Sequence, residues 1–200
     1  MSTIKHKLIE FIVTFLYVGK IRYCPGTFGS LCAFPISYWL ACMIRDGDKI
    51  LMNFNYLPIT MLILINTIVA LLLFIVGIYY SSLYIKITNR QDPKEVVIDE
   101  VVGQMLTSSM CLLSLTILRG TSIDKILTLE FRNLILFLLL PFILFRIFDI
   151  VKPWPISWLD QNIDGGLGVM IDDVLASCFA SVVYFLIIFF TNNKIAYILG

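Results

Sequence analysis

Long apolar runs with few charges dominate the chain, and a helix needs about 20 predominantly apolar residues to cross a membrane. Five runs approach or reach that length, at residues 28–44, 57–80, 101–118, 134–151 and 174–190. The fourth does so only if its helix continues through Arg146 and Asp149. A shorter stretch at 8–18, interrupted by Glu10, is expected to form an interfacial or re-entrant helix. We therefore predict an all-α, polytopic transmembrane helix bundle of about five spans.

The composition indicates a membrane protein with one domain over residues 1–200. Hydrophobic residues make up 59% and charged residues 14% of the chain, and the mean hydropathy is +0.91. The apolar share exceeds the roughly 45–50% of soluble domains. A net charge of +1 gives no sign of nucleic-acid binding. The five cysteines are an odd number without pair spacing, so we expect small buried side chains rather than disulfides or a zinc site.

The first 22 residues resemble a secretory signal peptide only in part. Lys5 and Lys7 precede an apolar stretch, as in a signal peptide. Lys20 and Arg22 then follow where small residues should mark a cleavage site. We expect this segment to be retained.

Lysine and arginine are unevenly divided between the two sides that five crossings create. One side would hold nine of them, namely Lys5, Lys7, Lys20, Arg22, Lys86, Arg90, Lys94, Arg146 and Lys152. The other would hold six, namely Arg45, Lys49, Arg119, Lys125, Arg132 and Lys194. Because cytoplasmic loops carry an excess of these residues, the bias predicts that the first side is cytoplasmic.

Charged residues stand at the ends of three predicted spans, where each charge at membrane depth costs roughly 2.5–3.5 kcal/mol. The third and fifth spans open on an acidic pair, and the fourth closes on a cation, an anion and a cation at three-residue spacing. These residues are Asp99, Glu100, Arg146, Asp149, Lys152, Asp172 and Asp173. The alternation of the spans puts all of them on one membrane face, so we predict that they form one catalytic site.

The acidic members of this site are candidate metal ligands. Five carboxylates placed close together repel one another and need cations, and oxygen-only ligands suit Mg²⁺. The candidates are Asp99, Glu100, Asp149, Asp172 and Asp173. The alternative is that helix dipoles stabilise the acids. This could account for one acidic pair, but it accounts poorly for two pairs together with Asp149.

The basic members are candidate phosphate ligands. Arg146 and Asp149 should share a helix face at three-residue spacing, and so should Asp149 and Lys152. Arg146 can bind a phosphate through two N–H groups at once, and Lys152 can add a point charge. The alternative is an internal salt bridge. Pro153 and Pro155 should end the helix and position Lys152 at the rim of a cavity.

Two glycine-containing segments lie on the same predicted face. Residues 25–30, Pro-Gly-Thr-Phe-Gly-Ser, combine a turn with a helix start, and Thr27 and Ser30 are candidate substrate ligands there. A simple helix N-cap by Thr27 is an equal alternative. The segment 165–168 offers backbone freedom near the second acidic pair, or close helix packing.

Two phosphatase chemistries are excluded by residues that the chain lacks. The only histidine is His6, near the N-terminus, which excludes phosphohistidine lipid phosphatases. No cysteine is followed six residues later by arginine, which excludes the cysteine-phosphatase loop. These exclusions favour a carboxylate-held metal that acts on a phosphoryl group.

Four motif segments follow one another along the chain, at residues 24–31, 97–103, 145–156 and 164–174. The third contains Arg-x-x-Asp-x-x-Lys-Pro-x-Pro, and the fourth contains the Asp-Asp pair. Together they resemble the phosphatidylglycerophosphatase A family, over nearly the whole chain and without departure at the polar motif positions. The resemblance implies an Mg²⁺-dependent lipid phosphatase of the bacterial inner membrane. Its reaction would be hydrolysis of phosphatidylglycerophosphate to phosphatidylglycerol and phosphate.

In the expected reaction the acids hold Mg²⁺, with Asp149 as a ligand or just behind one, and Arg146 and Lys152 neutralise the phosphoryl oxygens. Attack by water and attack by a carboxylate, through an aspartyl-phosphate, both stay open. The expected partner is a phospholipid in the membrane, and no obligatory protein partner is inferred. Rival interpretations are a small ion or proton transporter with a carboxylate relay, and a scaffold subunit without chemistry. A transporter should carry charges near the bilayer midplane, whereas these lie at one rim.

Overall fold

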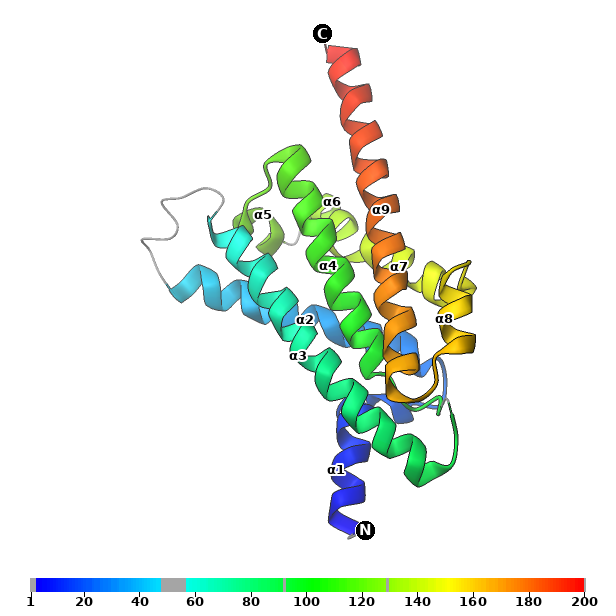
Figure 1. Ribbon diagram of the computed structural model, residues 1–200. Helices are drawn as coiled ribbons and strands as arrows, with labels where there is room; N and C mark the ends of the chain where they lie inside the picture. Colours follow the sequence, from blue (N-terminus) through cyan, green and yellow to red (C-terminus); the bar gives the residue numbers. More distant parts are fainter. Residues whose placement is uncertain (1–2, 48–56, 92, 129, 200) are drawn as a thin grey trace.

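The computed structural model describes residues 3–47, 57–91, 93–128 and 130–199, and helices dominate it (Figure 1). The long helices are α2 (Pro25–Gly47), α3 (Leu57–Thr88), α4 (Ile98–Arg119) and α9 (Gly165–Leu199). The shorter ones are α1 (Thr3–Val13), α5 (Ile123–Leu127), α6 (Phe131–Leu134), α7 (Leu140–Val151) and α8 (Ile156–Asn162). A 3-10 turn, η1 (Val18–Lys20), and a π-helix, η3 (Ile135–Leu139), join them. The described residues contain no strand, so the all-α prediction is confirmed.

Four helices of the described part of the chain, α2, α3, α4 and α9, are long and apolar enough to cross a membrane. They contain four of the five predicted spans. The remaining run, 134–151, is helical and ends at Val151 as expected. It is divided among the end of α6, the π-helix η3 and the twelve residues of α7, and none of these pieces alone has the length of a span.

α4 is the central helix of the bundle and packs against α2, α3, α7 and α9. In its most apolar stretch 72% of the residues are buried, against 22–33% in the other three long helices. Figure 1 shows α4 beside α9, with α2 and α7 crossing behind them. The close approach of α7 to α4 depends on Gly103 of α4, because a Cβ there would come within 2.6 Å of the ring of Phe145 on α7. The acids at the start of α4 are thereby surrounded by other helices.

The outer surfaces of the long helices are apolar, as contact with lipid requires. On α3 the exposed side chains include Leu64, Leu71, Leu72 and Ile75. Phe190 of α9 is exposed as well. A soluble monomer rarely exposes apolar patches of this extent, so this surface and the four long helices identify a membrane protein.

α1 is short and packs against α3, where Ile9 and Val13 share a buried cluster with Tyr84. Its eleven residues are too few to cross a membrane, as expected for the stretch at 8–18. Glu10 is neutralised by Lys20, with 2.5 Å between Oε1 and Nζ. The placement of α1 at the membrane interface stays a prediction.

The polar segments between the apolar runs, 81–97, 119–133 and 152–166, are expected from the sequence to be loops, but all three contain helix. α3 continues to Thr88, α5 lies within 119–133, and α8 lies within 152–166. The prediction followed apolar runs, and helices that leave the hydrocarbon core no longer need such a run. Lys49, which the sequence assigned to the side with fewer lysines and arginines, lies outside the described residues.

Candidate active site

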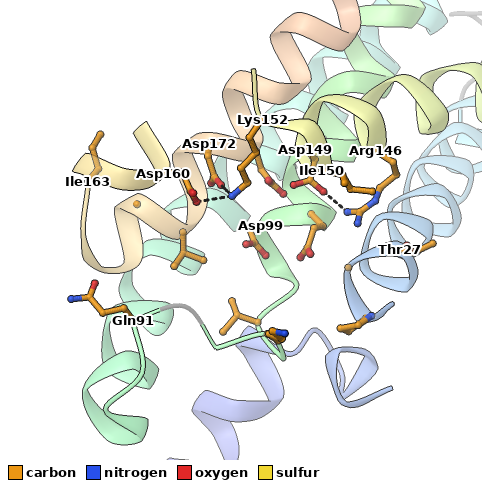
Figure 2. A pocket seen from close by; sticks show the side chains of 18 of the residues that line it. Thr27, Gln91, Asp99, Arg146, Asp149, Ile150, Lys152, Asp160, Ile163 and Asp172 are labelled. Carbon is orange, nitrogen blue, oxygen red and sulfur yellow. Dashed lines mark hydrogen bonds and ion pairs between the residues drawn. The ribbon is translucent and has the colours of Figure 1, made fainter. Parts of the chain in front are cut away.

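A cavity of about 410 Å³ opens between α2, α4, α7 and α9 (Figure 2). The predicted site residues that line it are Thr27, Asp99, Glu100, Arg146, Asp149, Lys152, Asp172 and Asp173. Among the described residues, Ser30 does not line the cavity but is buried in contact with Arg146. The fold thus brings side chains that are distant in sequence to one cavity.

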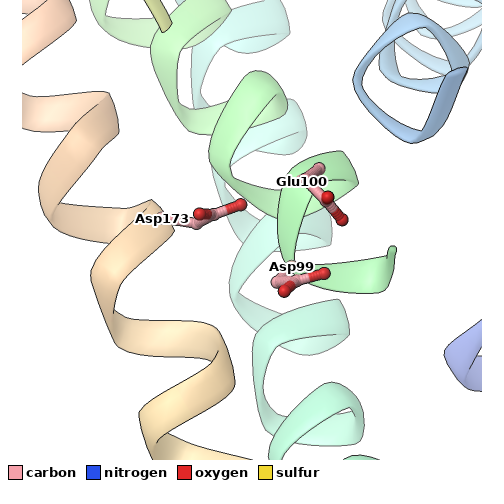
Figure 3. A group of neighbouring side chains, drawn as sticks. All are labelled: Asp99, Glu100 and Asp173. Atoms are coloured by element: carbon pink, nitrogen blue, oxygen red, sulfur yellow. The ribbon is translucent and has the colours of Figure 1, made fainter. Parts of the chain in front are cut away.

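Three of the predicted metal ligands face one another across α4 and α9 (Figure 3). Asp99, Glu100 and Asp173 each place one carboxylate oxygen within 4.8 Å of the other two. Each also has a buried oxygen without a hydrogen-bond partner, namely Asp99 Oδ1, Glu100 Oε2 and Asp173 Oδ2. Buried anionic oxygens without partners are costly, so this cluster is suited to a bound cation.

The helix dipole explains only part of this cluster. Asp99 and Glu100 lie in the first turn of α4, where the dipole stabilises acids. The sequence also placed Asp172 and Asp173 at the start of a helix, and this prediction was wrong because α9 begins at Gly165. The pair lies about two turns inside α9, where the dipole effect has faded. The acids of α9 therefore need another source of stabilisation.

Arg146 is held by contacts from its own helix and from α2. It forms an ion pair with Asp149, and both side chains are largely buried. Its Nη1 also donates to the Ser30 hydroxyl at 3.4 Å, while its Nε is buried without a partner. Asp149 in turn interacts electrostatically with Glu100 and Asp173. The salt bridge that stood as the alternative is present, and it leaves the buried Nε–H of Arg146 without a partner.

Lys152 follows α7 and turns toward α8 and α9. Its backbone is left-handed, with φ 44°, and Pro153 cannot continue the helix. The predicted shared helix face of Lys152 and Asp149 is therefore wrong. Nζ of Lys152 donates to Asp160 and to Asp172 at 2.6 Å each. Partial burial alone would lower the pKa of Lys152, but these two carboxylates raise it above its ordinary value, so the amine stays charged.

The start of α2 forms one wall of the cavity. The helix begins at Pro25, so Thr27 is its third residue and the N-cap alternative is wrong. The backbone N–H of Thr27 donates to the Cys24 carbonyl at 3.0 Å, so it serves the turn and not an anion. Gly26 lies against the carboxylate of Glu100. The segment therefore contributes close packing and the side chain of Thr27.

The cavity carries more negative than positive charge. Its seven acids are Asp99, Glu100, Asp149, Asp160, Asp164, Asp172 and Asp173, and its three bases are Lys94, Arg146 and Lys152. A surplus of carboxylates would repel a phosphate group unless further cations bind. The acidic side chains offer only oxygen atoms as metal ligands, and several of these oxygens have no hydrogen-bond partner. The residues therefore fit a hard divalent ion such as Mg²⁺.

Three charged residues of the cavity were not predicted as site residues, namely Lys94, Asp160 and Asp164, of which Asp164 opens the fourth motif segment. Asp160 on α8 accepts a hydrogen bond from Lys152, and Lys94 lies in the loop before α4. Both stand in polar segments, where a charge is ordinary and attracts no notice. The predicted topology could have indicated them, because the segments that carry Asp160 and Lys94 were both assigned to the membrane face that holds the acidic pairs.

The matches to known proteins extend over most of the chain. Phosphatidylglycerophosphatase A of Escherichia coli K12 is 32% identical over 163 residues, which cover 81% of this chain and 73% of that protein. The Haemophilus influenzae protein of the same name is 30% identical over 169 residues, covering 84% and 82%. A Bacteroides thetaiotaomicron protein named "Putative phosphatidylinositol-3-phosphatase" is 30% identical over 162 residues, covering 81% and 82%. No solved structure matches the chain.

The family comparison agrees with the motifs that line the cavity. The phosphatidylglycerophosphatase A family matches residues 11–188, which include α2 to α8 and the part of α9 that carries the acidic pair. The chain therefore belongs to the phosphatidylglycerophosphatase A family and is a membrane lipid phosphatase, a phosphoric monoester hydrolase.

Proposed function

We propose that this phosphatase hydrolyses phosphatidylglycerophosphate to phosphatidylglycerol and inorganic phosphate, and that it requires Mg²⁺. The carrying observation is the cluster of Asp99, Glu100 and Asp173, whose oxygens lie within 4.8 Å of one another and are partly unpartnered. Arg146, the proposed phosphate ligand, lines the same cavity. The names of the Escherichia coli and Haemophilus influenzae relatives support the substrate.

The acids and the bases have separate tasks in this proposal. The residues that would hold Mg²⁺ are Asp99, Glu100 and Asp173, with Asp149 and Asp172 beside them. A bound Mg²⁺ would neutralise phosphoryl oxygens and lower the pKa of a bound water. Arg146 donates its unused Nε–H to the phosphate. Lys152 adds a second positive charge when a phosphoryl oxygen replaces Asp160 as its acceptor.

Two routes of attack on phosphorus are compatible with these residues. Water attacks in line in the first route, and a cavity carboxylate attacks in the second, with an aspartyl-phosphate as the intermediate. Rapid acid quenching of enzyme mixed with substrate labelled in the terminal phosphate separates them. Label that appears on the protein and decays with turnover supports the carboxylate route, whereas unlabelled protein during turnover supports attack by water.

The proposed location is the bacterial inner membrane, with the cavity open to the cytoplasm. The acidic cluster lies near the end of α4 that follows the 89–97 loop. Lys94 and Arg90 of that loop, together with Lys152, belong to the side with more lysine and arginine. Accessibility of a cysteine placed at Lys86 to a membrane-impermeant thiol reagent tests the orientation, in a variant whose native cysteines are replaced.

The decisive assay is phosphate release by purified protein in a neutral detergent. Phosphatidylglycerophosphate should yield phosphate with Mg²⁺, lose that activity with EDTA, and recover it when Mg²⁺ is restored. Asp99→Asn and Asp173→Asn should each strongly reduce release at the Mg²⁺ concentration that saturates the wild-type enzyme. Trp158→Ala is the control, because Trp158 is 52% exposed and is not among the described residues that line the cavity. Wild-type rates in either acid variant would contradict the ligand assignment.

The same assay separates the remaining alternatives. Phosphatidylinositol 3-phosphate belongs in the substrate panel because of the name of the Bacteroides thetaiotaomicron relative. A proton or ion transporter would move charge across proteoliposomes without releasing phosphate. The cluster lies near one end of α4, since Asp99 and Glu100 are in its first turn, and this favours chemistry at the headgroup level over transport through the midplane.

A further inference from the structure

Three basic side chains line the cavity, and two of them are paired with carboxylates. Arg146 pairs with one acid, and Lys152 pairs with two. Lys94 lines the same cavity and is exposed, and it forms no ion pair within the part of the chain that the structure describes. It is therefore a cation with capacity for an external anion.

The loop that carries Lys94 is anchored on both sides of it. Pro93 and Val96 are buried, and the Val96 N–H donates to the Pro93 carbonyl at 2.9 Å. Glu95, the neighbour of Lys94, forms an ion pair with Arg90 instead of with the lysine. The backbone of Lys94 is thus fixed at the cavity wall, and its charge is not cancelled by the adjacent acid.

Gln91 and Lys94 both line the cavity and precede α4 in the chain. Gln91, from the same loop as Lys94, lies on the far side of Asp99 from both Arg146 and Thr27 (Figure 2). Lys94 lines the cavity from the segment before α4 and Arg146 lines it from α7, so a ligand that binds both contacts two different segments of the cavity wall. The volume of about 410 Å³ is in the range of sites for small ligands and can accept such a headgroup.

The substrate of the proposed function carries two phosphates. The terminal one is a monoester, and the other is a diester that links the headgroup to diacylglycerol. We propose that Lys94 binds the phosphodiester while the monoester lies at the acidic cluster, so that Lys94 selects lipids that carry both groups. The inference rests on the proposed function and adds a second point of contact to it. The ammonium group is a point charge, which suits the two non-bridging oxygens of a diester with a single negative charge.

The test uses two inhibitors that each contain one of the two phosphate types. Phosphatidylglycerol keeps the diester and lacks the monoester, whereas inorganic phosphate lacks the diester. Lys94→Gln should raise KM for phosphatidylglycerophosphate and the inhibition constant of phosphatidylglycerol by about 10-fold, as expected for loss of one charge-assisted contact. Inhibition by inorganic phosphate should not change. Lys94→Arg should restore the wild-type values, because it restores the charge.

Two controls identify the source of any effect. Lys86→Gln removes an exposed lysine at the end of α3 that is not among the described cavity residues, and it should leave all constants unchanged. Oleate added to the neutral micelles supplies surface charge without phosphate, and it should not inhibit in a Lys94-dependent way.

Four other results would contradict the proposal that Lys94 binds the phosphodiester. The diester subsite would be overturned by wild-type constants in Lys94→Gln, by equal weakening of both inhibitors, or by an effect of oleate that depends on Lys94. A lack of inhibition of the wild-type enzyme by phosphatidylglycerol would overturn it as well. All four results leave the proposed function intact. Absence of phosphate release by the wild-type enzyme would instead overturn the proposed function and the subsite together.

Discussion

Gly26 at the start of α2 lies directly against the carboxylate of Glu100 on α4. A Cβ at Gly26 would overlap Oε1 of Glu100 and would lie 3.3 Å from Nη1 of Arg146. Only a hydrogen atom fits between the backbone of α2 and these two side chains. The first turn of α2 therefore restricts where the carboxylate of Glu100 can lie.

This contact predicts that Gly26→Ala impairs catalysis without unfolding the protein. The added methyl group must push Glu100 away from Asp99 and Asp173, and displacement of a reacting group by about 1 Å can cost about 100-fold in rate. We expect kcat/KM for phosphate release to fall by about that factor, while the thermal unfolding temperature in detergent changes little. Phe28→Ala, at an exposed position in the same turn, is the control and should stay active. Full activity of Gly26→Ala would contradict the proposed position of Glu100.

Asp172 and Asp173 are neighbours with different partners, so their substitutions should have different effects. Asp173 belongs to the three-acid cluster, whereas Asp172 accepts a hydrogen bond from Lys152 at 2.6 Å. Asp173→Asn should raise the Mg²⁺ concentration for half-maximal activity by about 10- to 100-fold or more. Asp172→Asn should lower kcat with a much smaller change in the Mg²⁺ requirement, because it mainly releases Lys152. Mg²⁺ titrations of residual activity measure both, and equal shifts in the two variants would refute the division of roles.

Arg146 should not be replaceable by lysine. Its guanidinium pairs with Asp149, donates to Ser30 and keeps Nε–H unused, and an ammonium group cannot make these contacts together. We expect Arg146→Lys to reduce kcat/KM by about 100-fold, the usual effect of losing a donor that stabilises charge in the transition state. Arg90→Lys, outside the described cavity lining, is the matched control. Similar activity of both variants would mean that Arg146 supplies charge alone.

The charged positions were predictable because the apolar context makes them conspicuous. Asp99 and Arg146 interrupt runs that should be uncharged, and the alternation of spans puts such interruptions on one face. The helical course of the chain through Arg146 to Val151 was predictable for the same reason. These arguments need only the energetic cost of charge at membrane depth and the length of a span.

The details of the site depend on features that residue spacing does not encode. Spacing put Lys152 on the face of Asp149, but the helix ends first, and a left-handed backbone turns the lysine toward α8 and α9. Asp160 could not be recognised as its partner, because α8 is short and lies in a polar segment. The start of α9 at Gly165 was missed because its first residues carry glycine instead of an apolar run.

Glu95 predicts a pH dependence of stability. The Tyr84 hydroxyl donates to it at 3.0 Å and Arg90 pairs with it. Burial alone would raise the pKa of Glu95, but its backbone hydrogen bond, Arg90 and Tyr84 together hold the pKa below its ordinary value. A depressed pKa in the folded state gives stabilisation that is present above the unfolded-state pKa, about 4.3, and is lost as the pH falls through the folded-state value.

Glu95→Gln should therefore lower the unfolding temperature at pH 7 and have a smaller effect at acidic pH. The pair is partly exposed, so we expect about 1 kcal/mol or less, which corresponds to about 2–4 °C for a chain of this size. Thermal unfolding in detergent at pH 7 and at pH values below about 4 measures the difference between variant and wild type. A difference that grows toward acidic pH would have the wrong sign for this carboxylate.

The π-helix η3 contains a carbonyl that its own helix cannot satisfy. In this register the Leu140 N–H donates to the carbonyl of Ile135, five residues earlier. The next donor would be residue 141, which is proline and has no N–H, so the carbonyl of Leu136 lacks a helical partner. The hydroxyl of Tyr184 on α9 donates to it at 2.8 Å, and Tyr184 is fully buried.

Tyr184→Phe should consequently destabilise the protein by about 1–3 kcal/mol, because it leaves a buried carbonyl without a partner. Activity below the unfolding temperature should be retained, since Tyr184 is not among the described residues that line the cavity. Pro141→Ala restores a backbone N–H in the right register, so the loss caused by Tyr184→Phe should be smaller in that background. The measurement is a double-mutant cycle of unfolding free energies, with Tyr79→Phe, at an exposed position of α3, as the control. Strict additivity of Pro141→Ala and Tyr184→Phe would show that the two residues do not share the carbonyl of Leu136.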